Sequence, residues 1–574
     1  MQLLMKRISK LHMMTYLRAN FSKVLWAILM AFIAILVIYP ILELIKQSFT
    51  YNDLFSLAAY REVFSNNHTY IAFYNTLKLQ ILVLVISWVF GGFLALIRVK
   101  TNFRHKKMID RFVFLSMVFP PFIFATSIKL FFGNNGFLER IYTFLSLDYS
   151  VNIYSFSSAA LALSLHMYPF VYYGVRNRLE ILDDDVLNSA KTLGLNKFSI
   201  VFKIILPLLA PAFISTGLLV LARTMANYSV PAELLLPKGI EVLTTRIYSA
   251  QSSLALNKTA VLCLIMIFIT TSIFGFSMML EKKSTRKAIS VIDSHNEPVI
   301  EFRHKPNIII SFIIFAFFVF VTLVPLGVII LASFFKRWGL KIFSSDGMGI
   351  RWDYLTLNNY SILFKDGLIW KPLMNSFIYG FVASLIASLI SVLVVYMINY
   401  KKGALSKALI IVAQLPLAIP NIILAIAAMM AFRKAPFDFY GKPIIMIVTY
   451  SLLFTPVCVK QVMSVSQNLD KSVYDASRTM GVSQIAFFKD IFLKQIINGV
   501  FAGFVMTFLI AFKEIPLSLL LYTNNTKTLG VLLYIVQSNS YGLEMTSAVS
   551  VVVIIISLVL NYILSKVRNG ASKI

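Results

Sequence analysis

Residues 182–195 read LDDDVLNSAKTLGL, and residues 469–482 read LDKSVYDASRTMGV. The second stretch follows the first by 287 residues, and the same shift places Pro456 on Pro169. Similarity at a fixed distance along a chain indicates an internal repeat. The sequence therefore predicts two copies of one structural unit, each with the same order of elements.

Each stretch predicts a helix, a tight turn and a second helix. Gly194 and Gly481 fit a left-handed helix terminus, a conformation that favours glycine. A second short helix over 197–206 should lead to Pro207 and the next apolar run. The apolar positions recur at helical spacing; they are Leu182, Val186, Ala190 and Leu193 in the first copy and Leu469, Val473, Ala476 and Met480 in the second. Acidic residues suit the positive end of the helix dipole at each start; they are Asp183, Asp184, Asp185 and Asp470.

Long apolar runs flank both stretches. Hydrophobic residues make up 58% of the chain and charged residues 14%, with a mean hydropathy of +0.79. A soluble domain carries about 25% charged residues, so lipid must solvate much of this chain. The runs lack the alternation of barrel strands, which predicts an all-α polytopic membrane protein with about 12 spans. The candidate spans are 24–46, 72–97, 111–132, 155–175, 205–227, 258–280, 307–333, 372–398, 407–431, 443–462, 495–518 and 545–567.

The loops indicate orientation and module boundaries. Lys and Arg are about twice as frequent on the side of the N-terminus as on the other side, and positive loops are typically cytoplasmic. Both termini are therefore expected in the cytoplasm. Residues 1–280 form the first predicted module of six spans, 281–306 a polar linker and 307–574 the second module. An even number of spans per copy makes this a parallel repeat.

Residues further upstream align at a larger shift. Pro121 corresponds to Pro420, about 300 residues later. This predicts an insertion in the first copy, between its third and fourth spans.

Several classes of function are excluded by what the chain contains. The net charge of +28 lies in membrane-flanking loops, so nucleic-acid binding is not expected. Cys263 and Cys458 lie apart inside apolar runs and predict neither a disulfide nor a metal site. No GxxxxGK[ST] loop is present to hold ATP phosphates, and no catalytic constellation is found. We therefore expect no intrinsic catalysis and no metal or cofactor bound by this chain.

Polar residues near the ends of two equivalent spans are candidates for a translocation path. Arg223 and Asn227 belong to the first copy, and Lys513 and Glu514 to the second. Ionisable groups within a membrane are expensive and often mark a pathway. They would act as polar gates near the outer mouth; the alternatives are snorkelling to the interface or an internal ion pair. Lys78 and Lys129 also fall within predicted spans.

The paired loops resemble a known signature. Asn188, Ser189, Ala190 and Gly194 in the first copy, and Asp475, Ala476, Ser477 and Gly481 in the second, are similar to the EAA loop of binding-protein-dependent ABC permeases. That family has Glu-Ala-Ala, three residues and Gly, often followed by Leu-Pro. Leu206-Pro207 fits this pattern, whereas Asn188 and Lys494 depart from it. The resemblance implies that each short helix docks on an ATPase subunit; the alternative is an amphipathic helix on the membrane surface.

The likeness covers nearly the whole chain and is greatest to fused permeases of ferric-iron importers. It is carried by residues 230–235, 242–248 and 513–521. It implies a type I importer permease in the bacterial inner membrane, a separate ATP-binding subunit, expected as a homodimer, that uses ATP and Mg, and an extracytoplasmic solute-binding protein. Ferric iron is the expected substrate; phosphonate, a polyamine or another small solute is the alternative. An ion-coupled secondary transporter and a membrane enzyme are the rival classes.

Overall fold

The computed structural model describes residues 26, 29, 31–32, 34–51, 54–134, 136–182, 184–287, 304–338, 352–400, 404–467, 471–538 and 542–571. These residues are almost all helical, and one two-stranded antiparallel sheet pairs β1 (Thr50–Tyr51) with β2 (Leu54–Phe55). Of the sequence predictions, Asp183, Leu469, Asp470, both chain ends and most of the linker lie outside the described residues.

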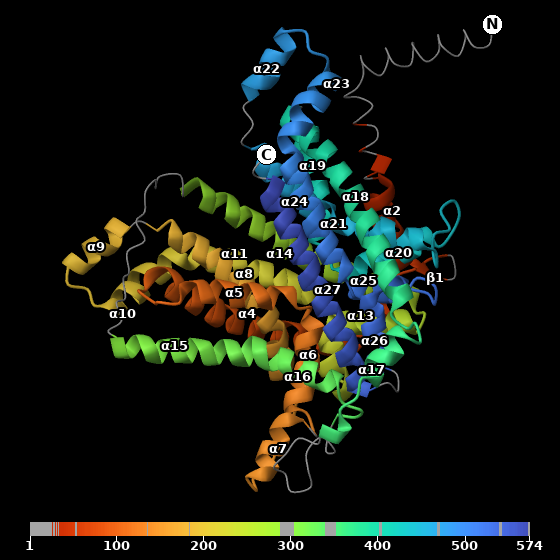
Figure 1. Ribbon diagram of the computed structural model, residues 1–574. Coiled ribbons are helices and arrows are strands. Elements are labelled where there is room, and N and C mark those ends of the chain that lie inside the picture. The colour runs from red at the N-terminus through yellow and green to blue at the C-terminus, as the bar shows by residue number, and fades with distance from the viewer. Residues whose placement is uncertain are drawn as a thin grey trace. The chain divides into compact units, whose positions relative to one another are not determined.

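The first half of the chain follows one order of helices (Figure 1). The helices are η1 (Ala34–Ile38), α2 (Tyr39–Ser48), α3 (Ala58–Ser65), α4 (Asn67–Lys100), α5 (Lys106–Val118), α6 (Pro121–Phe132), α7 (Phe137–Phe144), α8 (Phe156–Glu180), α9 (Asp184–Thr192), α10 (Lys197–Ile200), η2 (Val201–Ile205), α11 (Leu206–Met225), α12 (Ser229–Leu234), η3 (Leu236–Lys238), α13 (Leu243–Ser252) and α14 (Leu256–Lys287).

The second half repeats that order. The helices are α15 (His304–Phe318), η4 (Val319–Leu323), α16 (Val324–Ser333), η6 (Trp352–Tyr354), α17 (Asn358–Phe364), α18 (Trp370–Tyr400), α19 (Ala404–Gln414), η7 (Leu415–Leu417), α20 (Asn421–Phe432), α21 (Pro443–Ser466), α22 (Lys471–Thr479), α23 (Gln484–Ala486), η8 (Phe487–Phe492), α24 (Leu493–Phe512), α25 (Pro516–Leu521), α26 (Leu529–Ser538) and α27 (Gly542–Ala571).

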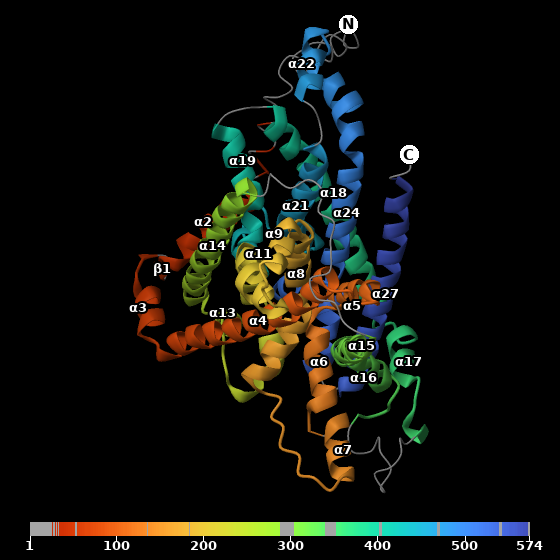
Figure 2. The same cartoon turned by 90° about the vertical axis from the view of Figure 1, so that its left-hand side faces the viewer.

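The helix boundaries reproduce the two shifts read from the sequence. α22, α24 and α25 begin 287 residues after α9, α11 and α12, whereas α20 begins 300 residues after α6. The difference is the insertion predicted in the first half. It contains α7, which continues beyond the end of α6 in both ribbon views (Figures 1 and 2).

Eight helices of the described chain are long and apolar enough to cross a membrane, or up to ten if each of two bent pairs is one span. This count covers the described residues, and two of the about 12 predicted spans do not enter it. The span expected at 24–46 lies partly outside the described residues, and the one at 155–175 forms the less apolar α8. The spans expected at 111–132 and 407–431 are each broken, by bends of 96° and 107°.

Proline accounts for both bends. Pro120 precedes α6 and Pro420 precedes α20, each with an extended backbone. Proline lacks the N–H that would continue the preceding helix, and its ring clashes with the carbonyl four residues earlier. An apolar run that looks continuous in the sequence therefore folds as two helices.

The separate short helix expected over 197–206 is also corrected. Residues 197–225 form one helical segment, in which α10 passes through the π-helical η2 into α11. Pro207 lies just after the π-helical turn, inside this continuous segment. The matching segment 484–512 has Lys494 at that position and still contains the π-helical η8, so proline is not required for this geometry.

Contacts divide the chain into two compact units. One comprises residues 48–368 and 533–555. Here α4 and α8 lie side by side, α11 packs against both, and α6 packs against α8 and α16 (Figure 1). α16 belongs to the second half of the sequence, so this unit joins helices from both halves.

The other unit comprises residues 1–47, 369–532 and 556–574. α18, α21 and α24 pack against one another, and η1 from the chain's beginning packs on α21. The Tyr39 hydroxyl donates to the carbonyl oxygen of Ala431 at 3.2 Å. The module boundaries at 280 and 307 stay a prediction, because they flank residues 288–303, which are not described.

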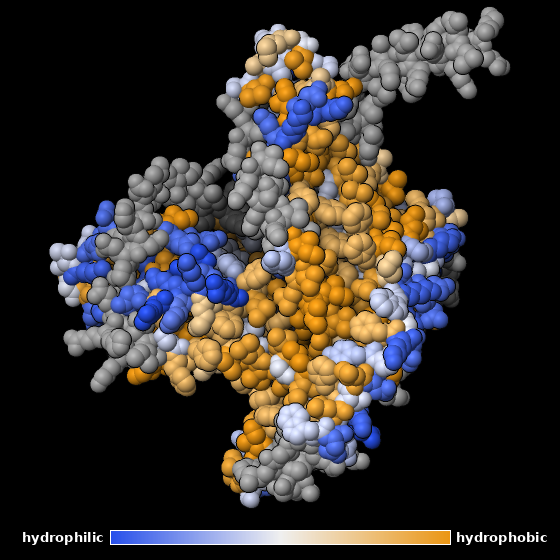
Figure 3. All heavy atoms as spheres, in the orientation of Figure 1, coloured by the Kyte–Doolittle hydropathy of each residue, from blue (hydrophilic) through white to orange (hydrophobic). Residues whose placement is uncertain are grey.

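Figure 3 shows apolar side chains over α24 and α27 on the visible face, and hydrophilic side chains around α9. The first pattern suits lipid contact, and the second suits an aqueous loop.

Candidate coupling loops and membrane-embedded polar residues

The two predicted loops have the same backbone. Gly194 and Gly481 have φ of +77° and +75°, the left-handed conformation expected of each. In the first loop the Leu195 N–H donates to the carbonyl of Ala190 at 3.1 Å; in the second, the Val482 N–H donates to that of Ser477 at 2.9 Å. These six-to-one bonds close a Schellman motif, which satisfies carbonyls at the helix end.

The next helix is capped alike in both loops. The Asn196 side chain accepts from the N–H of Ser199 at 2.7 Å, and the Ser483 side chain accepts from that of Ala486 at 3.2 Å. Asn and Ser are preferred caps because their oxygens reach these otherwise unpaired donors. Both loops are therefore specified locally, by a glycine and a capping residue two positions later.

The buried face of each loop helix differs from the predicted stripe. In α9 the buried residues are Leu187 and Ala190, whereas Val186 and Leu193 are exposed. Leu187 and Ala190 are three residues apart and share a face. Leu193 is turned outward by the Schellman turn and is 81% exposed.

α22 repeats this arrangement. Its Ser477 is buried and Tyr474 is half-buried, at the positions equivalent to Ala190 and Leu187. Ala476 and Met480 of the predicted stripe are exposed, Met480 to 75%. The predicted stripe is thus only partly buried: Leu182 and Ala190 lie inward, whereas Val186, Leu193, Val473, Ala476 and Met480 are exposed.

The signature residues divide between the two faces. Ala190 and Ser477 face inward, whereas Ser189, Asp475 and Ala476 are exposed and Asn188 is half-buried. Each loop helix therefore presents small or polar residues followed by one large apolar side chain. The first loop also exposes Phe198 and Phe202, to 77% and 63%.

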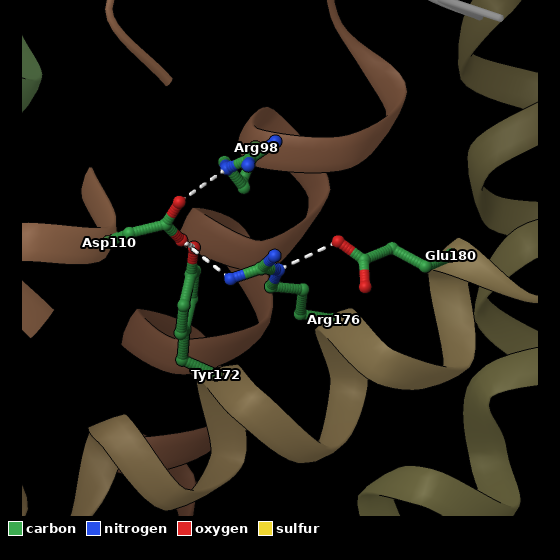
Figure 4. Close-up of polar contacts among 5 residues, drawn as sticks. All are labelled: Arg98, Asp110, Tyr172, Arg176 and Glu180. Carbon is green, nitrogen blue, oxygen red and sulfur yellow. Dashed lines mark hydrogen bonds and ion pairs between the residues drawn. The ribbon is translucent and has the colours of Figure 1, made fainter. Parts of the chain in front are cut away.

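An ion-pair network stands beside the first loop and was missed from sequence. Asp110 of α5 accepts from Arg98 of α4 at 2.9 Å and from Arg176 of α8 at 2.8 Å (Figure 4). Tyr172 donates its hydroxyl to the same carboxylate at 2.5 Å, and Arg176 also pairs with Glu180 at 2.8 Å. One carboxylate thus joins the ends of three helices just before α9 begins.

Two sequence signals could have indicated this network. Asp110 is the only acidic residue between Arg98 and Arg111, a strongly basic stretch. Arg176 and Glu180 have the four-residue spacing of helical ion pairs. The contact between α5 and α8 is long-range and could not be read from either signal.

The second loop is held by aromatic rings instead. Tyr474 of α22 lies 4.5 Å from Tyr400 and 5.0 Å from Phe487, between ring centroids. Tyr400 also contacts Phe487 and Phe492. Aromatic pairs at these separations are favourable beyond their buried area, so α22 is anchored by apolar packing.

Asn227 and Glu514, both predicted to line a path, occupy equivalent capping positions. The Asn227 side chain accepts from the N–H of Val230 at 3.0 Å, at the start of α12. The Glu514 carboxylate accepts from the N–H groups of Leu517 and Ser518 at 3.0 and 3.1 Å, at the start of α25. Both side chains thus stabilise the short helix that follows the span.

The basic members of the predicted path lie near the same span ends, in separate units. Arg223 is in the last turn of α11, and its guanidinium lies 4.7 Å from the ring centroid of Phe170. Lys513 is the C-cap residue of α24 and is half-buried. Their role in a path stays a prediction.

A buried ion pair in the first half was also missed. The Lys129 ammonium of α6 lies 2.5 Å from the carboxylate of Glu233 in α12. Lys129 was recognised as a charge within a span, but no pattern in the sequence indicated its partner. No group of three or more His, Cys, Asp or Glu that could hold a metal ion occurs in the described part of the chain.

These features define a class: a helical membrane protein with two matching modules, each carrying one helix–glycine–helix loop. The family described as binding-protein-dependent transport system inner membrane component matches twice, over residues 87–286 and 380–569. The chain belongs to this family of ABC importer permeases. The all-α polytopic fold with tandem permease modules is thereby confirmed.

Two relatives that match over most of this chain are ferric transport permeases. The chain is 24% identical over 530 residues to the ferric transport system permease protein FbpB of Actinobacillus pleuropneumoniae, covering 91% of this chain and 75% of the relative. It is 25% identical over 529 residues to the putative ferric transport system permease protein FbpB 1 of Haemophilus influenzae, covering 91% and 80%. It is 29% identical over 154 residues to the molybdenum transport system permease protein ModB of Escherichia coli K12, covering 27% and 66%.

Proposed function

We propose that this chain is the two-module permease of an importer that carries ferric iron into the cytoplasm. The observation that carries the proposal is the pair of loops with the same Schellman turn, 287 residues apart, in a chain of this family. Full-length likeness to proteins named ferric permeases supports the substrate. The shorter match to a molybdenum permease makes an oxyanion the alternative substrate.

The loops supply the surface for a separate ATPase subunit. Leu193 and Met480 project from equivalent positions, and each is more than two-thirds exposed. Exposed large apolar residues beside a polar rim are typical of protein contacts. The chain itself has no phosphate-binding loop of the GxxxxGK[ST] type; ATP and Mg would be bound by the partner, expected as a homodimer with one copy on each loop.

The remaining parts follow from this arrangement. Both termini and both loops would lie in the cytoplasm, and an extracytoplasmic binding protein would deliver the substrate to the opposite face. This chain would neither hydrolyse ATP nor retain a cofactor.

Docking is tested by replacing the two projecting side chains. Leu193→Glu and Met480→Glu should each reduce co-purification of the ATPase, because a carboxylate cannot enter an apolar contact without desolvation. Leu57→Glu is the matched control, since Leu57 is 57% exposed and lies on the predicted outer side. Equal ATPase recovery from all variants would contradict the assignment.

Substrate and energy source are tested in liposomes that contain the permease, the ATPase and the loaded binding protein. Uptake of radiolabelled Fe(III) should require internal ATP and be inhibited by vanadate. Uptake that survives vanadate but is abolished by an uncoupler would indicate a secondary transporter. Uptake of molybdate or a polyamine with no Fe(III) uptake would overturn the substrate.

A further inference from the structure

The short helix α12 carries a buried carboxylate that does not cap a helix. Glu233 is 8% exposed, and its contact with Lys129 joins α12 to α6. The Lys129 ammonium also lies 5.9 Å from the ring centroid of Tyr154. The Lys129 ammonium can therefore also form a cation–π interaction with Tyr154.

α26 brings further oxygen atoms to the same place. The Tyr534 hydroxyl lies 3.3 Å from that of Tyr228. Both polar atoms of the Gln537 side chain are buried and have no hydrogen-bond partner among the described residues. Tyr534 and Gln537 are three residues apart on α26 and share a helix face. Tyr228 directly precedes α12, so the contact between the two tyrosines places α12 and α26 along one seam.

The buried Glu514 carboxylate of the second half is held differently from Glu233. Glu514 accepts four hydrogen bonds, from the backbone of Leu517 and Ser518, the Ser518 hydroxyl and the Asn421 amide, all between 3.0 and 3.1 Å. Both carboxylate oxygens of Glu514 accept hydrogen bonds from residues at the start of α25. Glu233 is instead balanced by the Lys129 ammonium group.

Only one copy of the repeat carries this pair. The 287-residue shift places Leu520 on Glu233, and the 300-residue shift places Met429 on Lys129. The repeat therefore does not need this pair for its fold, since the second half builds the same helices with apolar residues there. A charged pair retained in one copy at a desolvation cost indicates a role specific to the path.

We propose that Glu233, Tyr228, Tyr534 and Gln537 form a transit site for a hard metal cation, ferric ion in this importer. Hard cations take carboxylate, carbonyl and hydroxyl oxygens, and the seam offers all three. Lys129 holds the carboxylate when the site is empty, and the arriving cation displaces its ammonium toward Tyr154. The substrate named here rests on the proposed function; the class of hard cation does not.

Measuring Fe(III) uptake by the assembled transporter distinguishes two roles for Glu233: a ligand of the cation, or one half of a structural ion pair with Lys129. Glu233→Gln should reduce uptake at least about tenfold, as losses around metal sites do, while stimulation of the ATPase by the loaded binding protein persists. Lys129→Gln with Glu233→Gln leaves no unpaired charge, so a merely structural pair would recover uptake in this double variant. Recovery would overturn the proposal, whereas a persistent loss supports it.

The matched control is another ion pair on the same unit. Arg246 and Glu241 lie 2.9 Å apart, outside the seam. Arg246→Gln with Glu241→Gln should leave uptake at the level of the unmodified protein. If uptake falls as far as in the Glu233 variants, the loss of any ion pair in this region impairs transport. That result would overturn the assignment of a cation site to Glu233.

Direct binding is measured with Tb³⁺, a hard trivalent probe whose emission is sensitised by nearby tyrosine. The purified permease–ATPase complex should show emission on tyrosine excitation that falls in Glu233→Gln and in Tyr228→Phe with Tyr534→Phe. Equal emission from Glu233→Gln and the unmodified complex would overturn the site. Glu233-dependent emission without Fe(III) uptake would sustain the site and defeat ferric iron as the substrate.

Discussion

At the scale of single residues, the two loop glycines are required for backbone conformation alone. An ideal Cβ at Gly194 or Gly481 would meet no atom within 4 Å, so space is not what excludes a side chain. Gly194→Ala and Gly481→Ala should each cost about 1–2 kcal/mol, the penalty of the left-handed conformation for other residues. That corresponds to roughly tenfold weaker association with the ATPase, which titration of the purified subunit would measure.

The chain offers matched controls for those variants. Gly275 and Gly327 also have open space where a Cβ would lie, but they are inside helices with ordinary φ. Alanine there should be neutral or stabilising by about 0.5–1 kcal/mol. A loss of ATPase binding in these controls as large as in the loop variants would show that the turn is not the cause.

Glu514 gives a second residue-scale prediction. Glu514→Ala removes the cap of α25 and leaves two buried N–H groups without their acceptor. Loss of a cap costs about 1 kcal/mol and each orphaned donor about 1–3 kcal/mol, so the purified protein should unfold at a clearly lower temperature. Asn227→Ala, with one capping N–H at stake, should shift the transition less.

Glu514→Gln distinguishes capping from a polar gate. An amide oxygen can still accept from the start of α25, so the stability loss should be partial. If Glu514→Gln is fully stable but Glu514→Gln and Glu514→Ala both abolish uptake, the carboxylate charge acts along the path as the sequence suggested. Unchanged uptake in a stable Glu514→Gln would exclude that role.

At the scale of elements, the Asp110 network should position α8 and thereby α9. Asp110→Asn removes two ion pairs whose partners are about one-quarter exposed, so the loss should be modest, about 1 kcal/mol. Substrate carried per ATP hydrolysed should fall by about fivefold on that basis. Glu180→Gln should have a smaller effect, because Arg176 still forms its ion pair with Asp110.

The outcome that would contradict this role is specific. If Asp110→Asn lowers uptake and ATPase activity in equal proportion, with less protein recovered, the network only stabilises the fold. A changed ratio of transport to hydrolysis at normal protein recovery supports positioning of the loop.

The equivalent prediction for the second loop concerns Tyr474. Tyr474→Ala removes ring contacts with Tyr400 and Phe487, each worth about 0.5–1.5 kcal/mol. It should loosen α22 and weaken ATPase recovery. Tyr474→Phe keeps the ring and should behave as the unmodified protein; failure of the Phe variant would show that the hydroxyl matters more than packing.

Local elements were predictable where local rules apply. The helix–glycine–helix loops follow from periodicity and from the left-handed preference of Gly194 and Gly481. The inward face of α9 was not predictable, because the sequence permits both the stripe through Val186 and the one through Leu187. Only packing against the spans decides between them.

At the scale of the whole chain, the repeat, its insertion and the helical membrane fold were all predictable, because a fixed shift and long apolar runs are visible without coordinates. The bends within two predicted spans were not predicted, although Pro120 and Pro420 lie where they occur. The contacts of Asp110 with Arg176 and of Glu233 with Lys129 could not be predicted, because these partners lie on helices distant in sequence. A charge within a predicted span, such as Lys129, indicates that a buried polar contact exists but does not identify its partner.

Because the two loops are anchored differently, only the first should respond to salt. The Debye length falls from about 10 Å at 0.1 M to about 3 Å at 1 M, which weakens the partly exposed Asp110 pairs. Aromatic packing at Tyr474 is not weakened by screening. Tryptic cleavage at Lys191 should therefore rise with NaCl, while cleavage at Arg478 stays constant, as mass spectrometry of the fragments would show.

Asp110→Asn is the control for this experiment. Cleavage at Lys191 should already be high in that variant and independent of salt. A salt response of the same size at both loops would indicate that charge does not distinguish them.

The unbroken helices 197–225 and 484–512 give each loop a lever of equal length. Each has 29 residues, which at 1.5 Å per residue is about 43 Å. If the loops lie in the cytoplasm as proposed, a helix of that length would carry a push on the loop along the whole span, and the π-helical turn near one end is the place where it could twist. Equal strokes applied at the two loops would therefore reach the caps at Asn227 and Glu514 with equal amplitude, although only the first stroke arrives beside Glu233.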